Sequence, residues 1–176
     1  MKRIIKIIIL AITVSSFIGA FFCLNYIRRI TIDNSHIFVC DNPTHHSDFD
    51  NWLLKECNVK SVPTYLVIKN NYVIGIFPGN ISESEFTNYL GTCLINNINY
   101  YSLPEYMITN LNKESYTLSN ISKKDYYILE ISWIDCDDCK NQDKYYTNKI
   151  YYKYTTNQIY RYYINSEFNK VYNKYN

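Results

Sequence analysis

A strand that leads directly into a Cys-x-x-Cys motif is the feature that most constrains this chain. Residues Tyr126–Trp133 are aromatic and branched, which favours a β-strand. Cys136 and Cys139 follow, and a helix is predicted to continue through Tyr146. A helix N-terminus offers free N–H groups and a partial positive charge that stabilise a thiolate. We therefore expect Cys136 to be a nucleophile and Cys139, one turn later, to be the resolving thiol.

The motif is unusually acidic. Asp135 precedes Cys136, and Asp137 and Asp138 separate the two cysteines. Nearby negative charge raises the pKa of a thiol because it disfavours the thiolate. A less stable thiolate gives a less oxidising dithiol couple. The sequence therefore predicts a reductase or isomerase in preference to a strong oxidant.

Two other interpretations of the cysteine pair stay open. It could form half of a zinc site, for which Cys40, His45 and His46 are the evident further ligands. The two histidines follow a proline turn and precede a helix start, which favours exposed loop residues instead. A purely structural disulfide would stabilise little across so small a loop. We expect neither a metal nor a cofactor.

The remaining cysteines occur singly, at Cys23, Cys40, Cys57 and Cys93. Isolated cysteines in apolar segments usually behave as small buried hydrophobic residues. An even count of six cysteines could also mean structural disulfides, but the spacing of the single cysteines assigns no framework to them.

The first half of the body has the predicted order β-α-β-β-α. Its expected elements are a strand at 35–40, a helix from Ser47 or Asp48 that carries Phe49, Trp52, Leu53 and Leu54, strands at Tyr65–Lys69 and Tyr72–Phe77, and a helix at Glu83–Leu94. Asn70 and Asn71 form a hairpin turn signal, and Ser82-x-x-Glu85 is a capping box. The second half adds a predicted helix at Lys113–Ile121, a strand at Ile159–Ile164 and a short helix from Ser166.

Two segments together resemble the thioredoxin superfamily. One is the cysteine motif after its strand, and the other is Val59–Ile68, which contains Val62-Pro63-Thr64. The cysteine half is also similar to thioredoxin-like accessory proteins of bacteriocin export. The resemblance implies an α/β fold, with a mixed sheet flanked by helices. It also implies a cis Pro63 that lies against the cysteines, and a substrate groove formed by Pro63, Thr64 and Trp133.

The order of these segments departs from the family, which places the cysteine motif before the proline. Here Pro63 precedes Cys136. We expect a thioredoxin-like C-terminal half at 34–95, a linker at 96–104 and an N-terminal half at 105–176. The halves could close into one circularly permuted domain, which we favour, or could be remnants of two separate domains.

The N-terminus predicts a membrane anchor over residues 1–29. A basic start is followed by an apolar run, Ile7–Leu24, which has no charged residue. Eighteen helical residues span roughly 27 Å, enough to cross a hydrocarbon core. A cleaved signal peptide and a buried helix are the alternatives. Arg28 and Arg29 put basic charge at both ends, and we favour an uncleaved signal anchor with the body outside the cytoplasm.

Charge excludes one function class. The formal net charge is +2 and the basic residues are dispersed, so a nucleic-acid partner is not expected. The sequence predicts a membrane-anchored thiol–disulfide oxidoreductase that acts on extracytoplasmic proteins or exported peptides and needs a redox partner to recycle it. The alternative is a catalytically idle thioredoxin-like adaptor that binds an exported peptide or a membrane partner.

Overall fold

The computed structural model describes residues 33–39, 48–142, 158–164, 166 and 168–175. Residues 32–176 form one compact unit, so strands from both predicted halves belong to the same body. The predicted anchor at 1–29 lies outside the described residues. Within them, no helix has the length and apolar character needed to cross a membrane.

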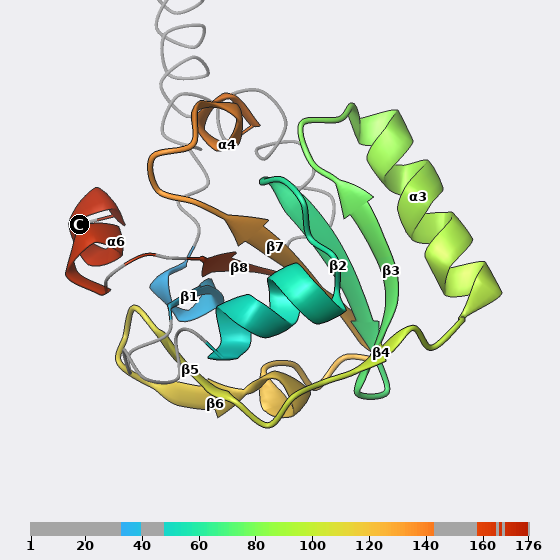
Figure 1. Ribbon diagram of the computed structural model, residues 1–176, viewed down its shortest axis with the longest axis horizontal. Coiled ribbons are helices and arrows are strands. Elements are labelled where there is room, and N and C mark those ends of the chain that lie inside the picture. Colours follow the sequence, from blue (N-terminus) through green and yellow to red (C-terminus); the bar gives the residue numbers. More distant parts are fainter. Residues whose placement is uncertain (1–32, 40–47, 143–157, 165, 167, 176) are drawn as a thin grey trace, which may run out of the picture. The chain divides into compact units, whose positions relative to one another are not determined.

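The body is mixed α/β and is built on one eight-stranded sheet with the order β4-β3-β2-β7-β8-β1-β5-β6 (Figure 1). The strands are β1 Ile37–Val39, β2 Thr64–Lys69, β3 Tyr72–Pro78, β4 Tyr101–Ser102, β5 Met107–Asn110, β6 Ser115–Thr117, β7 Tyr126–Ser132 and β8 Ile159–Tyr163. The strands β7, β8 and β1 run parallel to one another, and the other neighbours are antiparallel. The sheet is therefore mixed, as predicted.

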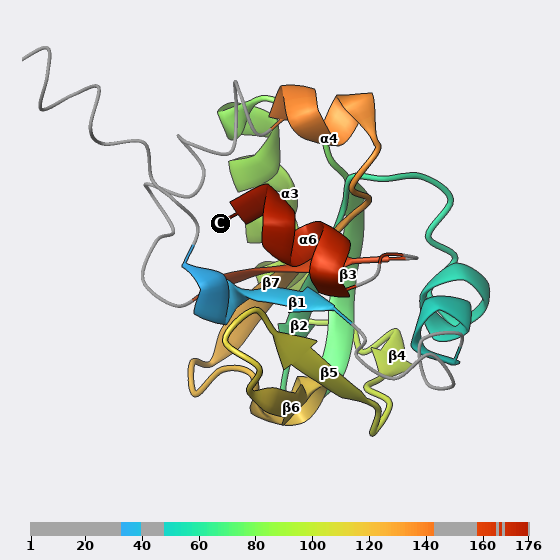
Figure 2. The same cartoon turned by 90° about the vertical axis from the view of Figure 1, so that its left-hand side faces the viewer.

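Helices cover both faces of the sheet. They are α3 Glu83–Asn96, α4 Asp137–Gln142, α6 Phe168–Tyr175, the 3₁₀ turns η1 Asn34–His36 and η3 Leu118–Asn120, and the π-helical turn η2 Trp52–Glu56, which continues a helix from residue 48. Figure 2 shows η2 on the opposite side of β2 and β3 from α3. The strands of this central part are consequently buried on both faces.

The β2–β3 hairpin turns at the two asparagines that the sequence singled out. Asn70 and Asn71 have φ values of 51° and 64°. Asparagine tolerates this left-handed conformation, and two such residues match the right-handed twist of paired strands. The predicted hairpin is confirmed, and it fixes the antiparallel register of β2 and β3.

Helix α3 begins with the predicted capping box. The backbone N–H of Glu85 donates to the Ser82 hydroxyl, and the Ser82 backbone N–H donates to the Glu85 carboxylate. These two bonds satisfy amide groups that have no partner within the helix. The helix then buries Phe86 and Leu90 against β2 and β3. It ends at Asn97, whose φ is 48°.

Both faces of the central strands bury apolar clusters, and one face also buries an ion pair. On one face Leu53 packs with Leu66 and Leu129. On the other face, Arg161 donates to Glu130 at 3.0 Å, and both side chains are fully buried. Removing one partner of such a pair typically costs 3–5 kcal/mol because the other charge stays buried. The sheet therefore depends on both partners being present.

Three sequence predictions need correction. The expected helix at Lys113–Ile121 is instead β6 followed by η3, because residues 115–117 pair with β5. The predicted linker at 96–104 contains β4, which pairs with β3. Leu54 is exposed although Leu53 is buried, because consecutive residues of a helix point in directions about 100° apart. Non-local strand pairing overrides local propensity in the first two cases.

Candidate functional site

Strand register brings two distant segments together at one end of the sheet. In the antiparallel β2–β7 pair, Thr64 lies opposite Ile131. The start of β2 therefore meets the end of β7. The loop that precedes β2 ends at Pro63, and the cysteine motif follows β7, so both lie at this end.

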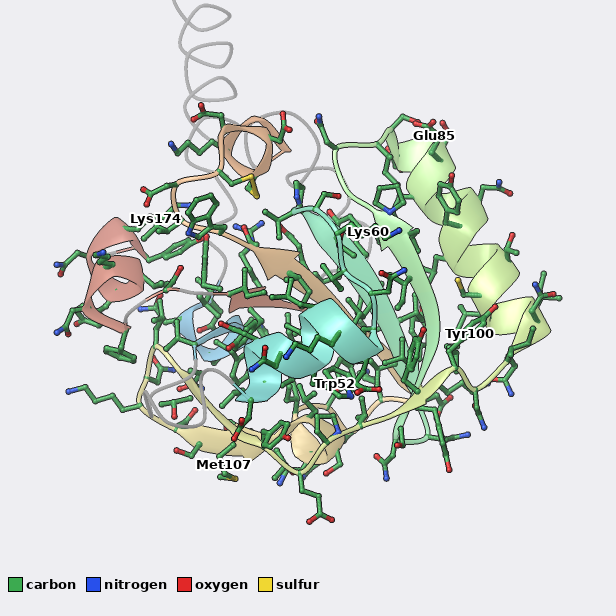
Figure 3. The ribbon with its side chains drawn as sticks, viewed as in Figure 1. Trp52, Lys60, Glu85, Tyr100, Met107 and Lys174 are labelled. Atoms are coloured by element: carbon green, nitrogen blue, oxygen red, sulfur yellow. A yellow bond between two sulfur atoms is a disulfide. The ribbon has the colours of Figure 1, made fainter. Side chains whose placement is uncertain are left out.

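Cys136 and Cys139 form a disulfide, visible as the yellow bond beside α4 in Figure 3. Their Cα atoms are 5.2 Å apart, and the backbone N–H of Cys139 points to the Cys136 sulfur at 3.0 Å. The Cys136 side chain is partly exposed, whereas Cys139 is only 1% exposed. A reacting molecule can therefore approach Cys136 but not Cys139. This N–H would also favour the thiolate form of Cys136 once the bond is reduced.

The proline loop contacts the accessible sulfur. The Cys136 sulfur lies 3.6 Å from the Val62 carbonyl oxygen, although the two residues are 74 positions apart. In the disulfide the sulfur carries no hydrogen, but the Cys136 thiol could donate to this oxygen after reduction. The Val62–Pro63 peptide bond is cis, as predicted.

Two hydrogen bonds hold this loop in place. The Thr64 hydroxyl donates to the Ser61 carbonyl at 2.6 Å, and the Gly79 N–H donates to the Pro63 carbonyl at 2.8 Å. Pro63 and Thr64 are themselves buried. Pro63 and Thr64 therefore shape the backbone of the loop. The polar atom that faces Cys136 is the carbonyl oxygen of Val62, which the sequence did not single out.

Trp133 and three aspartates lie close to the cysteine pair in the chain. Trp133 is 44% exposed at the end of β7, and Asp135, Asp137 and Asp138 are exposed. Lys140 forms an ion pair with Asp137 at 3.1 Å on the surface. Exposed pairs of this kind contribute little to stability. The negative charge of the aspartates still acts on a molecule that approaches the Cys136 sulfur.

Metal binding gains no support from the part of the chain that the structure describes. There, no three His, Cys, Asp or Glu side chains converge as metal ligands. Cys40, His45 and His46, the further ligands considered for zinc, lie outside the described residues. The zinc interpretation therefore stays untested.

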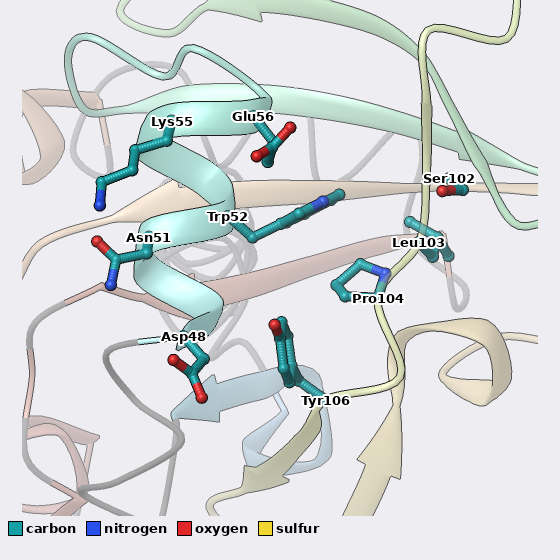
Figure 4. A pocket seen from close by; sticks show the side chains of 9 residues that line it. All are labelled: Asp48, Asn51, Trp52, Lys55, Glu56, Ser102, Leu103, Pro104 and Tyr106. Carbon is teal, nitrogen blue, oxygen red and sulfur yellow. The ribbon is translucent and has the colours of Figure 1, made fainter.

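A separate hollow of about 470 Å³ lies between the helix at 48–56 and the chain around β4 (Figure 4). The Trp52 ring is directed toward Leu103 and Pro104, and Tyr106 lies below it. Asp48 and Glu56 also line the hollow. Trp52 stacks on the buried Phe49 ring, which fixes the wall of the hollow. No cysteine lines it, so it is distinct from the disulfide site.

Comparisons with protein-family models, curated proteins and solved structures find no match to this chain. The site must therefore be interpreted from its own residues. Sequence reasoning named both cysteines and Pro63 but missed the Val62 carbonyl, since a backbone atom leaves no residue-type signal. It also missed the buried pair of Glu130 and Arg161. The signal was present, because each is a lone charge inside an otherwise apolar strand.

Proposed function

We propose that this protein is a thiol–disulfide oxidoreductase of reductase or isomerase type, with a thioredoxin-like fold in permuted order. The contact between the Cys136 sulfur and the Val62 carbonyl is the observation that carries the proposal. It places a cis-proline loop against a Cys-x-x-Cys disulfide, the combination that the sequence resemblance implies. The strand order β3-β2-β7-β8 supports it, because both halves contribute to one sheet.

In the proposed reaction the Cys136 thiolate attacks one sulfur of a substrate disulfide. The substrate S–S bond breaks, one substrate thiolate leaves, and a mixed disulfide with Cys136 forms. The Cys139 thiolate then attacks the Cys136 sulfur and releases the second substrate thiolate. Two electrons pass to the substrate, whose two thiolates take up the protons that the cysteines release. The protein is left as the disulfide, and a dithiol partner would reduce it.

The burial of the two cysteines supports these separate roles. Cys139 is enclosed and needs to reach only Cys136, whereas Cys136 is open to a substrate. Pro63 and Thr64 would hold the Val62 carbonyl toward the substrate chain, and Trp133 would border the groove. The three aspartates favour the reducing direction, since negative charge opposes the thiolate form of the dithiol.

We also propose that the body acts from a membrane anchor at residues 1–29 and faces outside the cytoplasm. This part rests on the basic start and the uncharged run Ile7–Leu24. Membrane fractionation and protease accessibility of the full chain in cells would test it. A full chain released by high salt would contradict the anchor.

Trapping of a mixed disulfide tests the redox function. In Cys139→Ser, the intermediate on Cys136 cannot be resolved, so a covalent adduct with a peptide disulfide should accumulate. The double variant Cys136→Ser with Cys139→Ser is the matched control and should form none. If Cys139→Ser forms no adduct, the adaptor function is favoured instead. An equilibrium with glutathione as oxidising as that of strong disulfide donors would contradict the reductase direction.

A further inference from the structure

We propose that the site prefers substrates that carry Lys or Arg beside the reacting disulfide, with Asp135 and Asp138 as the residues that set this preference. The inference rests on the proposed function and names its substrate class. Because Cys139 is enclosed, a substrate sulfur must approach Cys136 and therefore meets the residues around it.

The rim of Cys136 is negatively charged. Asp135 and Asp137 flank Cys136 in the chain, Asp138 follows one residue later, and all three are exposed. Within the described residues, only Asp137 of the three has a basic partner, Lys140 at 3.1 Å. Asp135 and Asp138 therefore keep their charge available to an incoming chain.

The proline loop opposes this charge only weakly. Lys60 is exposed on the loop, labelled in Figure 3, and it is the one basic residue among positions 57–64. Counting Lys60 and Lys140 against the three carboxylates leaves an acidic balance of one charge. The two unpaired carboxylates are also adjacent or nearly adjacent to Cys136 in the chain. A cationic segment would thus gain attraction at the point where its sulfur reacts.

The contacts of the loop suggest how such a substrate would lie. The Val62 carbonyl, 3.6 Å from the Cys136 sulfur, can accept a backbone N–H from an extended segment. Side chains that flank the substrate cysteine would then extend toward the rim. Basic ones would meet Asp135 and Asp138. Electrostatic steering of this kind raises association rates by roughly 10- to 1,000-fold and weakens with salt.

Matched peptides on the reduced full chain in neutral detergent test the preference. Each peptide carries one cysteine as a mixed disulfide with neutral 2-thiopyridine, flanked by Lys, Ser or Glu. Cys136 attacks the peptide sulfur, the mixed disulfide breaks, and thiopyridone is released and followed by absorbance. Rates are divided by those of the same peptides with dithiothreitol, which removes differences in intrinsic reactivity.

We expect the Lys peptide to react about tenfold faster than the Ser peptide at low salt, and the Glu peptide to react more slowly. The difference should shrink at about 0.5 M salt, where the screening length is only a few ångströms. The double variant Asp135→Asn with Asp138→Asn should lose most of the rate difference between the Lys and Ser peptides. The control, Asp125→Asn with Glu105→Gln, removes two exposed carboxylates elsewhere and should keep it.

The outcomes separate the two proposals. Equal normalised rates for the three peptides, with all of them reacting, would overturn the preference and leave the redox function intact. The same holds if the preference survives in the Asp135 and Asp138 double variant. No reaction with any peptide would overturn the redox function and the preference together. Lys60→Gln should increase the ratio of the Lys peptide to the Ser peptide.

Discussion

The Cys136–Cys139 pair and the free thiols of Cys57 and Cys93 place the same side chain in different surroundings. Cys136 lies at the end of a strand, partly exposed, with an N–H and a carbonyl directed at its sulfur. Cys57 is 2% exposed in the apolar core. Burial, together with the negative charge of Glu56, raises the pKa of the Cys57 thiol to about 12. Cys93 is half-buried in α3, and its pKa is raised by burial.

The comparison shows that position in the fold decides what a cysteine can do here. A thiol reacts as its thiolate, so a raised pKa and a closed environment together make it inert. Cys57 and Cys93 fill space, as the sequence predicted for isolated cysteines, while the pair after β7 meets solvent and polar groups. Variants of these cysteines and of the residues that pack on them test this contrast.

Loss of Cys136 should have the largest effect. We expect Cys136→Ala to reduce the rate of exchange with a neutral peptide disulfide at least about a thousandfold, because the attacking atom is removed. The exchange rates of Cys57→Ala and Cys93→Ala should stay within about twofold of the rate of the unchanged chain. A comparable loss of rate in either control would show that the free thiols take part in the reaction and would contradict the difference drawn here.

Alkylation should distinguish the thiols directly. With the pKa of Cys57 at about 12 in place of 9.0, its thiolate fraction near pH 8 is lower by about a thousandfold. Iodoacetamide should therefore modify Cys57 in the folded chain about a thousandfold more slowly than in urea. Mass spectrometry of the Cys57 peptide measures both rates. Similar rates would mean that the core around Cys57 opens readily.

The packing of Cys93 depends on a glycine in β3. A Cβ atom added at Gly75 would overlap the Cys93 sulfur and lie 2.8 Å from the Cys93 Cβ. We expect Gly75→Ala to lower the free energy of unfolding by about 1–3 kcal/mol, as overpacking does. Adding Cys93→Ala should recover only part of this, because the Cys93 Cβ stays close.

A second glycine is the matched control for that experiment. A Cβ at Gly91, in α3, meets no atom within 4 Å. Gly91→Ala should therefore stabilise the chain by about 0.5–1 kcal/mol through helix propensity. Urea unfolding followed by tryptophan fluorescence measures both variants. Equal effects of the two substitutions would contradict the packing argument.

Alkaline pH should lower the free energy of unfolding because Cys57 is buried with its proton. The folded pKa is raised, so below pH 9 both states hold the proton and the stability is fully present. Above pH 9 the unfolded state ionises first, and stability falls until about pH 12. At pH 10 the loss is about 1.4 kcal/mol. Cys57→Ala should reduce the fall in stability between pH 8.5 and 9.5. Part of the fall should stay, because the pKa of Cys93 is also raised in the folded chain and because the tyrosines of the unfolded chain ionise near pH 10. An unchanged pH dependence in that variant would contradict it.

Local sequence signals predicted most of the elements around the site. The turn at Asn70 and Asn71, the capping box at Ser82 and strand β7 are confirmed because each depends on residues only a few positions apart. The β5–β6 hairpin was missed for the converse reason. Strand β5 is only four residues long and pairs with β1, about seventy positions earlier in the chain, so local residues carried little information about it.

The features of the candidate site also separate into those that local sequence predicts and those that depend on distant contacts. The amino-acid sequence was enough to show two cysteines at helical spacing after a strand, three aspartates beside them and isolated cysteines in apolar segments. The contact between the Val62 carbonyl and Cys136, the enclosure of Cys139 and the pairing of Glu130 with Arg161 could be found only in the folded chain. Short-range patterns fix local conformation through backbone and side-chain preferences. Which distant segments touch is set by strand register and core packing, to which the whole chain contributes.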